Sequence, residues 1–496
     1  MDEIKEVVQF LSKKKLRRIE TLNLEEEGDS VYRDFYYILL NEPNISEEEL
    51  AKKIANTSKE DKKYGMIKSR FKKRLFNHAL FLELSENSTK QALEISNAYR
   101  SIYTSVLFRG NNIRKASYYI VNKTLKVIEK YELLDLLIIA YQIKLNESNF
   151  YNKPKKLNEY ADKLLYYSKA LSNYSNCLVI YEKASLILSK SKVLNQADLE
   201  KLNALIQDSL TVSELPEATF ETKWTMFNFK MNYYEYIGDY QSIEKQITYF
   251  EKIFLKKPIL FYKTRKLLLY SWKLDAFGYL KIRKGAKSLI NYLHDLYEPN
   301  SMGWYYIQRK ILYYYMHTEQ YVFAIDISHN VIESKKMTEL NIKLQEMWLL
   351  WHTYLQILNA NYNQEKLATI KLAKILNSVP QISKDKLGLN TLVRTLEIIY
   401  RYLIYDDENL IETYNALLIY KSRYLKPNKL RRAQIFFDMI TATSKRGFTN
   451  ETTKREGEKA LKRYERLKND NPERKAYEFI PYEKLIEVMM GRPAGN

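Results

Sequence analysis

The sequence predicts an all-α protein, most of it a superhelical array of paired antiparallel helices. Glycine (12) and proline (10) are each below half of their usual frequency in this 496-residue chain. Because the turns and bulges of sheet proteins depend on these residues, an all-β or α/β fold is disfavoured. Apolar residues recur with the helical period through most of the chain. A single core rarely exceeds about 250–300 residues, so the length implies several domains or an elongated repeat array.

The composition is that of a folded protein in a reducing compartment. Hydrophobic residues make up 46% of the chain, which is enough to bury a core. The only cysteine, Cys177, excludes an intramolecular disulfide and a cysteine-based metal site. The N-terminus is acidic and lacks the apolar run of a signal peptide, and no apolar stretch approaches the ~20 residues of a membrane helix. We therefore expect a cytoplasmic protein with no membrane association.

The net charge of +20 is distributed in patches. Residues 1–50 carry 7 Lys and Arg against 13 Asp and Glu, whereas residues 51–84 carry 10 against 3. Residues 421–496 carry 19 against 10. A basic balance suggests an acidic partner, such as nucleic acid, an acidic protein or a membrane surface. Lysine-rich helix surfaces that simply keep the protein in solution are the other explanation.

The N-terminal region is expected to form a small helical domain over residues 1–87. Helices are predicted at residues 2–19, 31–40, 47–55 and 62–84. Ser46 followed by Glu49 is a capping box, in which each side chain bonds to the backbone amide of the other residue. Pro43 cannot continue the second helix, so a turn precedes the third.

From about residue 88 the helices are predicted to form pairs, each separated by a short polar turn. The turns fall near Asn111, Pro154, Asn195, Asp239, Gly285, Gln320, Gln364, Glu408 and Asn450. Their spacing of about 35–45 residues is that of two-helix repeats. About nine pairs fit into residues 88–490, which end with a basic helix at 451–469 and a helix at 482–490 that could act as a cap. Residues 491–496 are expected to be an unstructured tail.

The stretch FNFKMNYYEYIGDYQSIEKQITYFEKI resembles a tetratricopeptide repeat. Phe227 stands at the aromatic position of the first helix, and Tyr234 follows seven residues later. The turn is Gly238-Asp239-Tyr240, Ile243 occupies the small-residue position of the second helix, and Pro258 ends the unit.

Two other segments match the same pattern, one through Tyr315, Tyr321 and Ala324 and one through Leu107, Ile113, Ala116 and Ile120. The usual first-helix glycine is absent, with Met231 and Leu312 in its place. The resemblance covers about three-quarters of the chain and implies a solenoid whose first helices line a concave groove.

No pattern typical of catalysis or of a cofactor site occurs, so we expect neither an enzyme nor a bound cofactor or metal. The glycines never approach the spacing of a phosphate-binding loop, and the five histidines show no paired-ligand spacing. His317 and His329 fall in the two helices of one pair and could approach each other, but two histidines without further ligands are weak grounds for a metal site. Cys177 lies on an apolar helical face typical of a small core residue. Acid pairs such as Asp406-Asp407 stand at helix starts, where the helix dipole favours negative charge.

The central first helices carry the candidate partner site. All five tryptophans fall in them, at Trp224, Trp272, Trp304, Trp348 and Trp351. The resemblance implies that neighbouring polar residues also face the groove. The predicted contact residues are Trp224, Asn228, Asn232, Trp272, Trp304, Arg309, Tyr313 and Trp348. Since tryptophan is favoured at binding hot spots, the first hypothesis is an interaction protein or scaffold that binds a protein or peptide partner. The alternative for the rings is plain packing between helices.

A second hypothesis is a DNA-binding regulator. The segment KSRFKKR follows the capped third helix, and the layout permits a helix-turn-helix. Its phosphate contacts would be Lys68, Arg70, Lys72, Lys73 and Arg74. Against this, such a charge run is often only the solvated face of an amphipathic helix. The layout resembles that of bacterial peptide-sensing regulators, which join a helix-turn-helix to tetratricopeptide repeats. A third hypothesis is a nucleic-acid-binding or virion structural component that uses the basic C-terminal surface.

Overall fold

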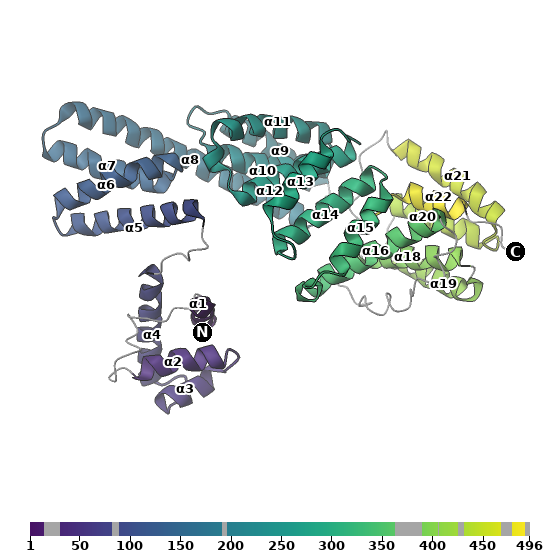
Figure 1. Ribbon diagram of the computed structural model, residues 1–496, viewed down its shortest axis with the longest axis horizontal. Coiled ribbons are helices and arrows are strands. Elements are labelled where there is room, and N and C mark those ends of the chain that lie inside the picture. Colours follow the sequence, from purple (N-terminus) through teal and green to yellow (C-terminus); the bar gives the residue numbers. More distant parts are fainter. Residues whose placement is uncertain are drawn as a thin grey trace. The chain divides into compact units, whose positions relative to one another are not determined.

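The computed structural model is helical throughout the part of the chain that it describes (Figure 1). The described residues are 1–13, 30–81, 89–190, 196–362, 389–404, 406–424, 431–467 and 479–491. Within these ranges there are twenty-one α-helices and no β-strand. No helix in these ranges combines the length and the apolar character needed to cross a bilayer. The predicted all-α class is therefore confirmed.

The chain divides into two units, Met1–Ala161 and Asp162–Asn496, and each is described by itself. The first unit opens with α1 (Asp2–Lys13), α2 (Ser30–Asn41), α3 (Glu47–Ala55) and α4 (Lys62–Phe81). These four helices enclose a hydrophobic cluster of their own, in which the Phe35 ring stacks on Phe71 with the centroids 4.3 Å apart. The capping box at Ser46 and Glu49 is confirmed, with both of its hydrogen bonds present. The predicted ends of the first and fourth helices lie outside the described residues.

Three further helices complete most of this unit: α5 (Lys90–Gly110), α6 (Arg114–Lys130) and α7 (Leu134–Phe150). α5 and α6 approach closely because two serines meet between them: the Ser105 and Ser117 hydroxyls lie 2.8 Å apart and both residues are buried. Tight turns join α5, α6, α7 and α8. Asn112 and Asn152 adopt left-handed backbone there, which asparagine tolerates better than most residues. The predicted turns near Asn111 and Pro154 are confirmed.

The next helix, α8 (Pro154–Lys190), is longer than the repeat spacing predicts. The expected pairs require a junction between two helices within this segment. Instead α8 is continuous over 37 residues. No glycine or proline occurs between residues 155 and 190, so nothing in the local sequence interrupts the helix. The predicted turn near Asn195 lies outside the described residues.

The second unit contains most of the predicted pairs (Figure 1). Its helices after α8 are α9 (Gln196–Ser213), α10 (Phe220–Ile237), α11 (Tyr240–Lys256), α12 (Lys263–Tyr279), α13 (Ala286–Leu296), α14 (Met302–His317), α15 (Tyr321–Ile332), α16 (Ile342–Tyr362), α18 (Leu389–Leu403), α19 (Asp407–Tyr424), α20 (Arg431–Ser444), α21 (Asn450–Leu467) and α22 (Tyr482–Met490). Neighbouring helices in this order pack against one another. The predicted turns at Asp239, Gly285, Gln320, Glu408 and Asn450 are confirmed, and the one at Gln364 lies outside the described residues.

The α10–α11 pair shows why these sequences form hairpins of helices. Gly238 ends α10 in a left-handed conformation with φ of 77°, which glycine adopts without a steric penalty. Asp239 then caps α11 by accepting a hydrogen bond from the Ser242 amide at 3.0 Å. Ile243 is 0% exposed and packs in a cluster with Phe227. Its predicted burial between the two helices is confirmed, and its place at their closest approach stays a prediction.

The last helix, α22, covers one end of the C-terminal core. It packs against α18, α20 and α21, and the Tyr482 ring stacks on Phe436 with the centroids 5.0 Å apart. α21 and α22 approach closely at Gly457, where an added Cβ would lie 2.6 Å from the Met490 sulfur. The helix predicted at residues 482–490 is therefore present and buries its apolar side in the core.

Candidate interaction surfaces

The first helices of three consecutive pairs carry rows of polar and aromatic side chains at helical spacing. The rows are Asn228, Asn232 and Glu235 on α10, Trp272, Asp275 and Tyr279 on α12, and Tyr306, Arg309 and Tyr313 on α14. Apart from buried Asp275 and exposed Tyr279, these side chains are half-buried. The helices are tied together by ion pairs. Arg265 of α12 donates to both carboxylate oxygens of Glu221 on α10, each at 2.6 Å.

A second ion pair, between Asp275 and Lys310, joins α12 to α14. The two side chains are only 8% and 13% exposed. Burial by itself would lower the pKa of Lys310, but the neighbouring Asp275 carboxylate outweighs burial and raises it. The Lys310 ammonium also lies 5.3 Å from the centroid of the Trp272 ring. Such a buried pair fixes the register of the two helices, because a shift of one helix would leave two buried charges without partners.

Beside this pair, Arg309 carries a charge that no described carboxylate contacts directly, although Asp275 is near enough to interact with it electrostatically. Its guanidinium lies over the Tyr306 ring, 5.2 Å from the centroid. Among the residues that the structure describes, none supplies a carboxylate within 4 Å of Arg309. The five N–H donors of a half-buried guanidinium therefore remain available for a bound molecule.

Stacked rings extend the rows in both directions. Tyr279 lies between Tyr240 and His317, with ring centroids 3.7 and 3.9 Å away. Tyr313 packs edge-on against Trp351, and burial raises the pKa of Tyr313 to about 12. Its hydroxyl therefore stays protonated at neutral pH. The rows thus combine flat aromatic area with a small number of polar groups.

The eight predicted contact residues divide into two sets. Trp224 and Trp348 are 6% and 1% exposed and lie in hydrophobic cores, so core packing accounts for these two rings. The remaining six are half-buried, namely Asn228, Asn232, Trp272, Trp304, Arg309 and Tyr313. Their contact with a partner stays a prediction. The prediction did not include four further residues of the rows and the ion pair, namely Asp275, Tyr279, Tyr306 and Lys310. Asp275 and Tyr279 follow Trp272 at spacings of three and seven, which is the helical period.

No protein-family model matches this sequence, and neither the curated proteins nor the solved structures include a significant match.

The predicted phosphate contacts of α4 also divide into two sets. Lys68 donates to Glu47, and Lys72 donates to Glu3 at 2.8 Å. That hydrogen bond is the main reason that the pKa of Glu3 falls to about 2. Arg74 lies over the Tyr32 ring, 4.4 Å from its centroid. These three cations thus bind to neighbouring helices of the same cluster.

Arg70 and Lys73, the other two predicted phosphate contacts, are exposed. The division follows from the helical period, which places residues three or four apart, such as Arg70 and Lys73 or Lys68 and Lys72, on the same face of α4 and residues two apart on different faces. A contact of either set with DNA stays a prediction.

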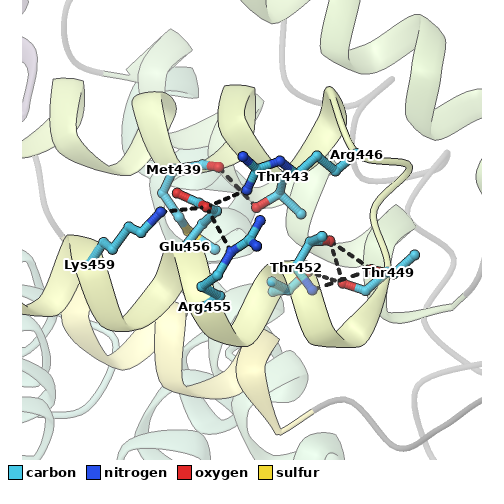
Figure 2. A network of polar contacts seen from close by, with 9 residues as sticks. Met439, Thr443, Arg446, Thr449, Thr452, Arg455, Glu456 and Lys459 are labelled. Atoms are coloured by element: carbon cyan, nitrogen blue, oxygen red, sulfur yellow. Dashed lines mark hydrogen bonds and ion pairs between the residues drawn. The ribbon is translucent and has the colours of Figure 1, made fainter.

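On the basic C-terminal surface, several cations meet at one carboxylate (Figure 2). Arg446, Arg455 and Lys459 all donate to the same oxygen of Glu456, at 2.9, 3.2 and 2.9 Å. Glu456 is 10% exposed, while the three cations are at least half exposed. The network joins the α20–α21 turn to α21. Part of the basic charge at this end therefore serves the packing of α21, and a role in nucleic-acid binding stays a prediction.

The side chains of His317, His329 and Cys177 pack against other residues of the fold. His317 stacks on Tyr279, whereas His329 lies 6.2 Å from His352, so His317 and His329 each have a different aromatic neighbour. Within the described residues no group of three or more His, Cys, Asp or Glu is placed to hold a metal ion. Cys177 is 0% exposed, and burial raises the pKa of its thiol to about 11. A buried, protonated thiol is a poor nucleophile.

His352 is held as a neutral imidazole. Its Nδ1 lies 2.8 Å from the Ser328 hydroxyl, which donates its own proton to the Ile325 carbonyl. The Gln356 amide nitrogen lies 2.9 Å from Nε2. In this network the Nδ1–H of His352 donates to the Ser328 hydroxyl and Nε2 accepts from the Gln356 amide. A proton added at Nε2 would therefore have no hydrogen-bond acceptor. Because the Ser328 proton points away from the imidazole, the pair is not arranged to activate a serine nucleophile.

We expect His352 to make the second unit sensitive to acid. Burial, with a contribution from His329, lowers the pKa of His352 from 6.5 to about 4. The unfolded chain takes up a proton near pH 6.5, so stability is full above that value and is lost as pH falls toward about 4. His352→Gln should flatten the fall of the melting temperature across this window. Equal losses in the two proteins would show that another group takes up the proton.

Proposed function

We propose that this chain is a non-enzymatic cytoplasmic interaction protein that binds a protein or peptide partner along the first helices of its central pairs. We further infer that the pairs stack as a tetratricopeptide-like superhelix, with α10, α12 and α14 on its concave side. The contact surface would comprise the half-buried rows, with Arg309 at its centre. Trp224 and Trp348 belong to the core and are left out of this surface.

The observation that carries the proposal is the state of Arg309. The neighbouring cation, Lys310, is neutralised by Asp275, whereas Arg309 has no carboxylate partner among the described residues. A folded protein gains little from a half-buried guanidinium without such a partner, because part of its hydration is lost. A bound partner would supply the missing hydrogen bonds. Arginine beside tyrosine and tryptophan is also the composition typical of binding hot spots.

A peptide suits this surface better than a small molecule. The rows extend over three helices, and their rings present flat area with a few separated polar groups. An extended or helical peptide can cover such a surface, with the rings supplying desolvated contact and the polar groups setting the register.

The test is a double variant, Arg309→Glu with Asn232→Ala. Neither side chain makes a hydrogen bond or ion pair with a described residue, so the fold should be retained. Binding of partners captured from the native host should weaken by about 2–5 kcal/mol, the usual cost of losing a hydrogen-bonded charge at an interface centre. Capture followed by affinity measurement on the purified partner provides the readout.

The matched control is Arg466→Glu with Asn415→Ala, which makes the same changes at two exposed positions of α21 and α19. The control should retain full affinity. An unchanged partner set and affinity in the Arg309 variant would move the site away from these rows.

A further inference from the structure

Helix α4 is basic without any compensating acidic residue. Its 20 residues include Lys62, Lys63, Lys68, Arg70, Lys72, Lys73 and Arg74, and no Asp or Glu. Like charges this close on one helix repel each other, which weakens the helix unless the charge is neutralised. The structure shows which of the seven cations are neutralised or packed and which are not.

Three of the cations face the helix cluster and help to hold it together. Lys68 and Lys72 bind the carboxylates of Glu47 on α3 and Glu3 on α1, and Arg74 covers the Tyr32 ring on α2. The buried side of α4 is apolar, and Tyr64, Phe71 and Leu75 are each 0% exposed. Part of the acidic charge of residues 1–50 is therefore directed at the flank of α4.

The other four cations, Lys62, Lys63, Arg70 and Lys73, are exposed, and we call them the outward set. Helical geometry places them within one sector of about 100°, over a length of about 16 Å. None of them makes an ion pair with a described residue. Met66, which is 56% exposed, also lies in this sector, and Ser69, which is small and polar, lies just beside it. The outward face of α4 is thus a strip of uncompensated positive charge on a firmly packed helix.

We propose that the outward face of α4 binds duplex DNA, with the outward set on phosphates and Ser69 toward the base edges. The charge is complementary to the DNA backbone, and an α-helix about 10–12 Å across fits a major groove about 12 Å wide. α4 follows α3 after a short turn and is supported by α1, α2 and α3, as a groove-reading helix requires. This function is independent of the partner surface in the second unit.

Two alternatives fit the strip less well. The major groove of duplex RNA is too narrow and deep for side chains to read, so an RNA duplex would not accept α4 in this way. A protein partner usually meets an apolar centre depleted in charge. Among the large apolar residues of α4 whose side chains the structure describes, only Met66 and Phe76 are exposed, at 56% and 38%.

The test measures binding of the full chain to a short fluorescein-labelled DNA duplex by anisotropy, from about 50 to about 200 mM salt. The variant replaces the outward set by glutamine. A charge-matched control replaces Lys445, Lys454, Lys462 and Arg466 by glutamine. These are also three lysines and one arginine, and all four are exposed and make no ion pair with a described residue. Both variants change the net charge equally, and neither removes a described ion pair. Circular dichroism checks that helix content is unchanged.

We expect the outward variant to bind at least about 100-fold more weakly at low salt, and its salt slope to fall by about 4, one per lost phosphate contact. The control should keep most of the affinity and slope of the wild type. The proposal is overturned if the wild type does not bind duplex DNA at low salt. It is also overturned if the two variants lose affinity equally, or if an RNA duplex of the same sequence binds more tightly than DNA.

Discussion

Replacing Ile243 by aspartate should destabilise the second unit by at least several kcal/mol. Ile243 is 0% exposed and packs in the α10–α11 cluster among Phe227, Met231 and Phe250. An aspartate there loses the apolar contacts and also places a charge inside an apolar cluster. Protonation of the carboxyl would reduce the cost without removing it. Thermal and urea unfolding, followed by circular dichroism, measure the loss.

Thr248→Asp is the matched control, because it adds the same charge at an exposed position of α11. Exposed substitutions usually change stability by less than about 0.5 kcal/mol. Ile243→Val separates the two contributions, since removing one buried methylene costs about 0.5–1.5 kcal/mol. A melting temperature unchanged by Ile243→Asp would contradict the packing of α11 on α10 and the repeat register that predicted it.

The Asp275–Lys310 pair should give the second large effect. Asp275→Leu leaves Lys310 with its ammonium largely buried and without a carboxylate, which costs about 3–5 kcal/mol. Lys310→Met leaves the Asp275 carboxylate in the same position and should cost about as much. Each single variant should therefore lower the unfolding midpoint of the second unit.

The double variant, Asp275→Leu with Lys310→Met, should recover most of that loss. Well-packed apolar side chains of similar volume often replace a buried ion pair at little or no cost. The three variants form a double-mutant cycle, and we expect a coupling energy of at least about 2 kcal/mol. Additive losses would mean that the two charges do not depend on each other, contrary to their buried contact.

Local sequence signals were sufficient for most of the helix boundaries. The capping box at Ser46, the left-handed Gly238 and the cap at Asp239 act within a few residues of themselves. Their effects can therefore be predicted from neighbouring residues in the sequence. The exception is α8, where the repeat spacing called for a junction but the chain contains no residue that breaks a helix.

The candidate surfaces were only partly predictable, because exposure depends on residues distant in the sequence. Residue type could not distinguish a buried tryptophan from a half-buried one. Trp224 and Trp348 fill cores, whereas Trp272 borders Lys310 of the next pair. The same holds for α4. Its charge run was evident, but the partners of Lys68 and Lys72 lie 21 and 69 residues away.

The sequence by itself determined the helical class, the paired arrangement and most of the turns, since these follow from periodicity, capping and the scarcity of glycine and proline. Only the tertiary structure decided which charges are neutralised inside the fold and which remain for a partner. Arg309 and Lys310 are adjacent in the chain, yet Lys310 alone meets a carboxylate, because α12 places Asp275 against one side of α14. A charge is neutralised according to its neighbours in space, and packing between helices determines those neighbours.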